Sequence, residues 1–340
     1  MNKDTLDTII KLLDRSGPIV IVGHKNPDGD AIGSSLGLSL FLRNRGHQTQ
    51  VVMPNDFPEF LKWLPDCSNI QCYDRNPGEV RNSIEQANLI FVLDFNALER
   101  TGDLEEELRR SEAPFVMIDH HQQPDDFAAA TYSDVSMSST SEMVYHLIEA
   151  LDGVKEISTD MSTNLYTGIM TDTGSFRFPA TTATTHRVIA KLIEAGANGS
   201  EIHEQIYDTN SPDKIKLLGV ALKNLEILPD FRTAYISLSQ KELDSNNFRK
   251  GDTEGFVNYA LSVQGVIFAV IFIENKQEGI TKISFRSKGS FSVNEFARSH
   301  FNGGGHTNAA GGRSNKGLRA TINEFISILP HYKNALIHAS

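Results

Sequence analysis

The sequence places acidic and histidine residues directly after short apolar runs. Residues 115–118 are four apolar residues that lead into Asp119, His120 and His121. Residues 18–22 likewise precede Gly23-His24, and residues 89–93 precede Asp94. Short apolar runs bounded by turn signals are typical of buried strands, and ligands of open α/β sheets bind beyond the carboxyl ends of such strands. The pattern therefore predicts a sheet with a functional site at one edge.

Strand and helix signals alternate along the first 120 residues. Strands are expected at residues 18–22, 50–53, 89–93 and 115–118, and helices at 4–15, 31–45, 79–87 and 103–110. Strands that alternate with helices predict an α/β fold with a doubly wound, mostly parallel sheet and right-handed connections.

The rest of the chain predicts a helical stretch followed by a second α/β domain. Helices are expected at residues 140–151, 159–171, 184–195, 201–207 and 212–225, strands at 232–238, 266–273 and 281–286, and a last helix at 318–333. We therefore expect an N-terminal domain over residues 1–190 and a helical connector over 191–225. A smaller C-terminal α/β domain over 226–340 is expected to lie across a cleft from the first.

The composition is that of a soluble globular protein. The 340 residues are 39% hydrophobic and 22% charged, and no apolar run reaches the length of a membrane span. The N-terminal residues lack the apolar region of a signal peptide. Two cysteines, Cys67 and Cys72, do not make a disulfide framework. We therefore expect a cytoplasmic protein with reduced thiols and no membrane partner.

The net charge of −11 argues against a protein that coats long nucleic acid. Residues 1–200 hold 16 basic against 29 acidic residues, whereas residues 201–340 hold 16 against 14. The acidic first part suits a cluster of metal-binding carboxylates, and the second part suits contact with an anionic substrate. Ordinary surface variation is the alternative.

Four separate segments supply candidate metal ligands. They are His24-x3-Asp28-x-Asp30, Asp94, Asp119-His120-His121 and Asp172. Carboxylates with a few imidazoles suit Mn²⁺, with Mg²⁺ as the second choice. Crowded carboxylates repel one another unless cations offset their charge, which favours two ions over one. Each residue taken singly could instead be an ordinary turn or helix-end residue.

Together the four motifs resemble the DHH phosphoesterase superfamily, whose name describes the triad Asp119-His120-His121. The glycine-rich segment at residues 303–312 resembles the family's substrate-binding DHHA1 domain. The two-domain layout is similar to the nanoRNase/pAp-phosphatase group.

The resemblance implies two metal ions, Mn²⁺ by preference, and a role for each ligand. His24 and Asp28 would bind one ion, Asp30, His120 and Asp172 the other, and Asp94 would bridge both. Asp119 would orient its neighbours. His121 would contact the scissile phosphate or donate a proton to the leaving oxygen.

The C-terminal domain supplies candidate substrate-binding residues. The three glycines Gly303, Gly304 and Gly305 allow close backbone approach to a ligand, and consecutive N–H groups can cradle phosphate. A mobile loop and a solvated strand end are the alternatives for the glycines and for Arg286. The resemblance favours phosphate or base contacts for Arg286 and His306, with Arg313 as a weaker candidate. Phe176, Phe178 and Tyr259 are guesses for base stacking.

The resemblance implies hydrolysis of very short oligonucleotides to nucleoside monophosphates and dephosphorylation of adenosine 3′,5′-bisphosphate. Hydrolysis of pApA or a cyclic dinucleotide is the second hypothesis. An inorganic pyrophosphatase, an exopolyphosphatase and a nucleotide sensor without turnover are less favoured. Two domains that hold one short ligand would leave no room for a long strand. The oligomeric state stays open, with a homodimer as one alternative.

Overall fold

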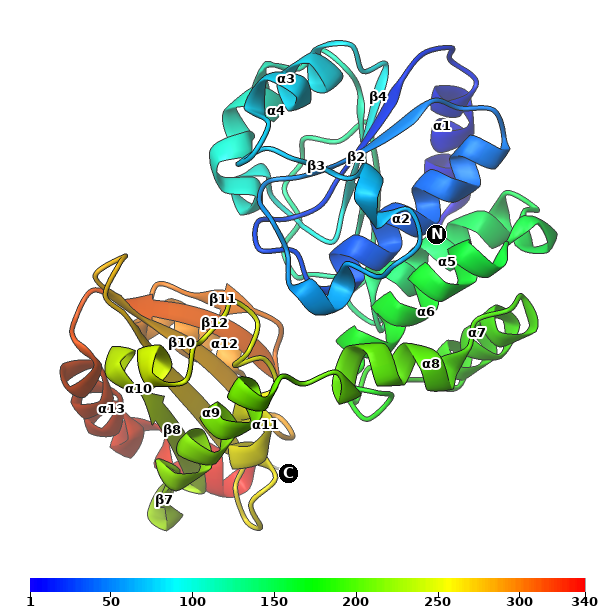
Figure 1. Cartoon of the computed structure of the whole chain (residues 1–340). Coiled ribbons are helices and arrows are strands. Elements are labelled where there is room, and N and C mark those ends of the chain that lie inside the picture. Colours follow the sequence, from blue (N-terminus) through cyan, green and yellow to red (C-terminus); the bar gives the residue numbers. More distant parts are fainter. Residues whose placement is uncertain (340) are drawn as a thin grey trace. The chain divides into compact units, whose positions relative to one another are not determined.

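A computed structural model of the chain describes residues 1–339 and divides into two compact units (Figure 1). The boundary lies between Thr209 and Asn210, inside the expected connector 191–225. Helix α8 (Gly199–His203) and a π-helical turn at Glu204–Asp208 therefore belong to the first unit. Helix α9 (Pro212–Lys223) belongs to the second.

The first unit is built on a six-stranded parallel sheet. Its strands lie in the order β3 (Gln71–Cys72), β2 (Thr49–Met53), β1 (Ile19–Val22), β4 (Leu89–Leu93), β5 (Phe115–Asp119) and β6 (Ala130–Ser133). In the central register, Ile19 of β1 lies beside Thr49 on one side and Leu89 on the other.

Both faces of this sheet are covered by helices, because the strands are apolar on both sides (Figure 1). Ile19 and Ile21 point into one core, whereas Val20 and Val22 point into the other. The first core is shared with α1 (Lys3–Leu13), α2 (Gly29–Asn44), α5 (Thr140–Ala150), α6 (Thr159–Asp172) and α7 (Ala183–Glu194). The second core is shared with α3 (Pro77–Glu85) and α4 (Glu105–Arg110).

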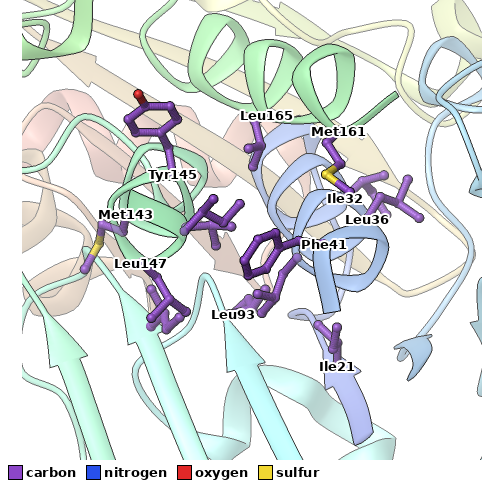
Figure 2. Close-up of a cluster of buried hydrophobic side chains, with 14 of the residues drawn as sticks. Ile21, Ile32, Leu36, Phe41, Leu93, Met143, Tyr145, Leu147, Met161 and Leu165 are labelled. Carbon is purple, nitrogen blue, oxygen red and sulfur yellow. The ribbon is translucent and has the colours of Figure 1, made fainter. Parts of the chain in front are cut away.

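Helix α2 is buried along most of its length and packs closely on α6. A Cβ atom on Gly33 would lie 2.4 Å from the carbonyl oxygen of Asn164, and one on Gly37 would lie 2.6 Å from Leu165. Only glycine permits this approach. Figure 2 shows Leu36 of α2 and Leu165 of α6 in the core that the two helices share. The close pairing fixes the ends of both helices, which carry candidate ligands.

The second unit has a mixed six-stranded sheet in which only β8 and β9 run parallel. The order is β11 (Gly304–Gly305), β12 (Ala309–Ser314), β10 (Ile280–Ser287), β9 (Phe268–Asn275), β8 (Thr233–Leu238) and β7 (Glu226–Leu228). One face packs on α12 (Val293–His300) and α13 (Leu318–His338), and the other on α9, α10 (Gln240–Ser245) and α11 (Phe256–Leu261).

The predicted α/β class, with a parallel N-terminal sheet and a smaller second domain, is confirmed. The short strands β3, β6, β7, β11 and β12 were not predicted. The last helix was expected to end at 333 but continues through Pro330 to His338. Cys67 and Cys72 are free and buried. Within the described residues, every helix is too short or too polar to cross a membrane.

Candidate active site

The candidate ligands gather where the strand order of the first sheet reverses. Strand β1 lies between β2 and β4, so the connections from β1 and β4 leave in opposite directions. Open α/β sheets bind ligands at such a switch point, beyond the carboxyl ends of the strands. His24 follows β1, Asp94 follows β4 and Asp119 ends β5. The sheet topology therefore joins three motifs that are far apart in the sequence.

The first group of side chains consists of His24, Asp28 and Asp94. Nε2 of His24 lies 3.9 Å from Oδ2 of Asp28 and 3.3 Å from Oδ2 of Asp94. Asp28 caps α2 with its other oxygen, which accepts from the N–H groups of Asp30 and Ala31. The cap fixes the Asp28 carboxylate, although its side chain is 49% exposed.

The second group consists of Asp30, His120 and Asp172. Nε2 of His120 lies 3.4 Å from Oδ2 of Asp172 and 3.9 Å from Oδ2 of Asp30. Asp172 is the last residue of α6, and Asp30 lies in the first turn of α2. The close packing of these two helices therefore brings both carboxylates to the same imidazole.

Asp94 lies between the two groups. Its Oδ2 faces His24, and its Oδ1 lies 3.5 Å from Nε2 of His120 and accepts from the Thr140 hydroxyl at 3.0 Å. The Asp94 backbone has φ = 65°, a left-handed conformation that is uncommon outside glycine and tolerated best by Asn and Asp. Such backbone strain is frequent at functional sites. One carboxylate is thus held so that each oxygen serves a different group.

The N-terminus of α5 holds Asp30, a relationship that the sequence did not predict. The backbone N–H of Thr140 donates to Oδ2 of Asp30 at 2.6 Å, and that of Ser141 donates to Oδ1 at 2.8 Å. Asp30 is buried, and helix N-termini favour negative charge. In the sequence, Ser139 before an apolar helix indicates the N-terminus of α5. No feature of the neighbouring residues indicates that Asp30 binds there.

The grouped charges shift the pKa values of the carboxyl groups in opposite directions. Burial, followed by the charges of Asp94 and Asp172, raises the pKa of Asp30 well above its usual range. Burial also raises the pKa of Asp172 to about 6, although the charge of His120 opposes the shift. For Asp94, burial would raise the pKa, but hydrogen bonds from His120 and His24 outweigh burial and hold it well below the usual range. Asp94 is therefore the carboxylate that stays ionised most readily.

The imidazole contacts fit a bound cation. Nδ1 of His24 lies 2.9 Å from the carbonyl oxygen of Lys25, and Nδ1 of His120 lies 3.2 Å from that of Met137. Because a carbonyl oxygen only accepts, Nδ1 of each ring carries the proton. A neutral ring then directs the lone pair of Nε2 at carboxylate oxygens, which is repulsive unless a proton or a cation lies between them. Carboxylate and imidazole donors without thiolates suit hard divalent ions.

The shortest contacts of His121 are with Asp119, although its Nδ1 also lies 3.9 Å from Oδ1 of Asp94. Oδ1 of Asp119 lies 2.6 Å from Nδ1 of His121, and Oδ2 accepts from the His121 N–H at 3.0 Å. Asp119 is fully buried. Since Nδ1 donates to Asp119, proton exchange by this ring goes through Nε2.

In the second unit, the glycine cluster forms a tight turn of the chain. The N–H groups of Gly303, Gly305 and His306 donate to Ala297, Asn294 and Ala309, so they do not form the phosphate cradle that three adjacent N–H groups could have formed. A Cβ atom on Gly303 would lie 2.0 Å from the Gly311 carbonyl oxygen, and one on Gly305 would lie 2.5 Å from that of Ala309. Close approach of β11 to β12 explains both glycines.

The side chains predicted to bind substrate in the second unit lie on or beside its sheet. Arg286 is near the end of β10, where its Nη1 donates to the carbonyl of Phe285 at 2.9 Å. Arg313 is exposed on β12, opposite Lys282. Gly304 belongs to β11, and half-buried His306 follows that strand.

The three guessed base-stacking residues differ in their surroundings. Phe176 packs edge-on against Tyr166 at 5.8 Å between ring centres, and the Phe178 ring covers Gly174. Tyr259 is 48% exposed on α11. Base stacking by any of them stays a prediction.

The fold and the paired groups define an α/β protein with carboxylates and imidazoles that could hold divalent ions at the switch point of its parallel sheet. Residues 18–169 match the DHH family, N-terminal domain, and residues 233–332 match the DHHA1 domain. The chain belongs to the DHH family, which confirms the resemblance seen in the sequence motifs.

Relatives and a solved structure extend this similarity over nearly the whole chain. The chain is 30% identical to the "Bifunctional oligoribonuclease and PAP phosphatase NrnA" of Bacillus subtilis, over 89% of this chain and 91% of the relative. It is 25% identical to the "Cyclic-di-AMP phosphodiesterase PdeA" of Listeria monocytogenes, over 88% of this chain but 45% of the relative. A crystal structure of an exopolyphosphatase-related protein from Bacteroides fragilis superposes with a TM-score of 0.95 at 38% identity, covering 99% of this chain and 98% of that one.

Proposed function

We propose that the protein is a two-metal phosphoesterase. It hydrolyses very short oligonucleotides to nucleoside monophosphates and removes a phosphate from adenosine 3′,5′-bisphosphate. The observation that carries the proposal is the position of Asp94, whose two oxygens face His24 and His120 in separate ligand groups. The similarity to the Bacillus relative over nearly its full length supports the substrate class.

Each ligand group would hold one divalent ion in this proposal. His24 and Asp28 would hold the first, and Asp30, His120 and Asp172 the second. Asp94 would contribute to both. When bound, the ions would supply charge neutralisation for the phosphate and activation of a water molecule. Mn²⁺ suits this mixture of carboxylates and imidazoles, and Mg²⁺ is the second choice.

The chain's own residues orient these groups and move protons. The N–H groups of Thr140 and Ser141 keep the Asp30 carboxylate directed toward His120. Asp119 fixes the His121 ring so that its Nε2 delivers a proton to the leaving oxygen. The raised pKa of Asp172 and the lowered pKa of Asp94 describe the groups without ions. Cation binding requires both carboxyl groups to be ionised.

The second unit supplies the substrate contacts in this proposal. Arg286, His306 and Arg313 bind the terminal phosphate or the base through their side chains. Gly303, Gly304 and Gly305 shape the turn that carries His306. Arginine suits this role because its guanidinium binds phosphate through two parallel hydrogen bonds.

Hydrolysis of pApA or a cyclic dinucleotide is the second candidate, favoured by the similarity to the Listeria phosphodiesterase. The chain spans less than half of that relative, whereas it spans most of the Bacillus relative. This difference in coverage favours the first candidate.

A substrate panel tests the proposal. Adenosine 3′,5′-bisphosphate, pApA, a cyclic dinucleotide, a ribodinucleotide and an RNA twenty-mer are each incubated with Mn²⁺, Mg²⁺ or a chelator, and products are separated by chromatography. We expect turnover of the bisphosphate and the dinucleotide with Mn²⁺, and none with chelator. Equal rates on the dinucleotide and the twenty-mer would remove the short-substrate preference.

A further inference from the structure

Arg100 lies beside the first ligand group, although no motif singled it out. It belongs to the 3-10 helix η3 (Leu98–Leu104), which follows Asp94. Its carbonyl oxygen accepts from the N–H of Lys25, the residue after His24, at 2.8 Å. This hydrogen bond ties the segment that carries Arg100 to the loop that carries His24. An arginine therefore lies next to the loop that supplies the first ligand group.

The Arg100 side chain has no protein partner within residues 1–339. No carboxylate lies within 4.0 Å of its guanidinium, and no side-chain hydrogen bond involves it. The residue is half-buried. A half-buried arginine beside buried carboxylates, but paired with none, has charge and donors available for an anion.

The backbone around Arg100 is held firmly. Buried Leu98 and Leu104 anchor both ends of η3 in the core, and the Thr101 hydroxyl donates to the Leu98 carbonyl at 2.6 Å. Gly102 has φ = 59°, and a Cβ atom there would lie 2.6 Å from the Lys25 side chain. The backbone that carries the Arg100 side chain is therefore fixed, as a binding residue requires.

The neighbouring cation, Lys25, is directed elsewhere. Its ammonium lies 3.5 Å from Asp103 in an exposed pair, which offsets its charge. Arg100 is therefore the better phosphate ligand of the two, because it is unpaired and offers a bidentate fork.

We propose that Arg100 binds a non-bridging oxygen of the scissile phosphate from the His24 side of the metal centre. This inference rests on the proposed function. It assigns part of phosphate recognition to the first unit, separate from Arg286 and Arg313 of the second. The guanidinium holds the phosphate in place and offsets the negative charge that develops during displacement.

The variants R100Q and R100K test the proposal, with R109Q as the matched control. Arg109 lies on exposed α4 and pairs with Glu105, so R109Q makes the same change in charge away from the site. Three quantities are measured: kcat and KM on the bisphosphate and the dinucleotide with Mn²⁺, the affinity for Mn²⁺, and the affinity of the Mn²⁺-loaded protein for inorganic phosphate by calorimetry.

We expect R100Q to lower kcat/KM on both substrates by about 10- to 100-fold and to weaken phosphate binding, since charged hydrogen bonds are lost. R100K should recover part of both losses, while Mn²⁺ affinity and the R109Q variant stay at wild-type values. Wild-type phosphate affinity and turnover in R100Q would overturn the proposal, as would a loss of Mn²⁺ binding that accounts for the lost activity. A wild type without turnover would refute the proposed function instead, and phosphate calorimetry would still decide the role of Arg100.

Discussion

The Asp119 carboxylate makes two hydrogen bonds with His121. Its Oδ1 lies 2.6 Å from Nδ1 of the His121 ring, and its Oδ2 accepts from the His121 backbone N–H at 3.0 Å. The carboxylate thus fixes both the tautomer and the direction of the imidazole. In the proposed function His121 transfers a proton, and Asp119 would then affect the reaction without touching the substrate.

Replacing this carboxylate should reduce turnover and leave the metal centre in place. In Asp119→Asn, an amide can donate as well as accept, so the imidazole tautomer is no longer enforced. We expect kcat to fall by about 100-fold or more. Bound metal, measured by elemental analysis, should equal that of the wild type. The exposed variant Asp126→Asn is the control. Undiminished kcat in Asp119→Asn would contradict a role for His121 in proton transfer.

Asp94→Asn should reduce activity more than Asp119→Asn does, because Asp94 belongs to the first ligand group and also faces His120 of the second. Asparagine tolerates the left-handed backbone at φ = 65°, so the variant should fold. Loss of the shared charge should reduce bound metal and remove several kcal/mol of transition-state stabilisation, a fall of about 1,000-fold or more in kcat/KM. Circular dichroism establishes folding, and elemental analysis gives the metal content. Full metal content with full activity would exclude a bridging role.

Gly168→Ala should damage both stability and the site. A Cβ atom at this position would lie 1.9 Å from Oγ of Ser141 and 2.9 Å from Oδ1 of Asp30. We expect a loss of about 1–3 kcal/mol in the free energy of unfolding, as for overpacked cores, and lower activity. Gly219→Ala is a matched control in helix α9, where nothing lies within 4 Å. This control should gain about 0.5–1 kcal/mol. Similar unfolding curves for the two variants would show that Gly168 is not tightly packed.

Metal ions should stabilise the protein as well as activate it. The carboxylates Asp30, Asp94 and Asp172 lie close together and repel one another when ionised, and cations relieve that repulsion. Addition of Mn²⁺ to chelator-treated protein at about 100 times its dissociation constant should raise the free energy of unfolding by about 2.7 kcal/mol per site. The thermal midpoint measures the effect. A midpoint that does not change with Mn²⁺ would argue against the site.

A titrating pair away from the site should make stability depend on pH. His146 lies 3.8 Å from Glu142 and 3.2 Å from Glu149. Interaction with Glu142 raises the pKa of His146 above 6.5, although burial opposes the shift. Burial alone would raise the pKa of Glu142, but interactions with His146, Ser138 and Thr185 lower it below 4.5.

The stabilisation of the folded protein by charged His146 is fully present below pH 6.5, and it is lost as the pH rises through the raised pKa of His146. The stabilisation by ionised Glu142 is fully present above pH 4.5, and it is lost as the pH falls through the lowered pKa of Glu142. His146→Gln should therefore lose roughly 0.5–1 kcal/mol more stability at about pH 5.5 than at about pH 8.5, as measured by urea unfolding. Equal losses of stability at both pH values in His146→Gln would contradict the pairing.

The parts of the fold that were predicted from sequence are those with strong local patterns. The apolar runs at 19–22, 89–93 and 115–118 became central strands, because residues buried on both faces must be apolar throughout. The short strands β7 and β12 were missed, since Glu226–Leu228 and Ala309–Ser314 carry little strand signal of their own. Pairing with neighbouring strands decides their conformation.

Sequence alone determined the order of the elements with strong local patterns and the chemical types available at the strand ends, because apolar runs, caps and turn residues act over a few positions. It also identified the motifs that place the chain in its family. Only the tertiary structure decided that the N–H groups of Thr140 and Ser141 meet Asp30 and that Asp94 faces two imidazoles. It also decided that the carbonyl oxygen of Arg100 meets the N–H of Lys25, the residue after His24. These relationships join residues far apart in the chain. They follow from how the sheet and helices pack, which no local pattern encodes.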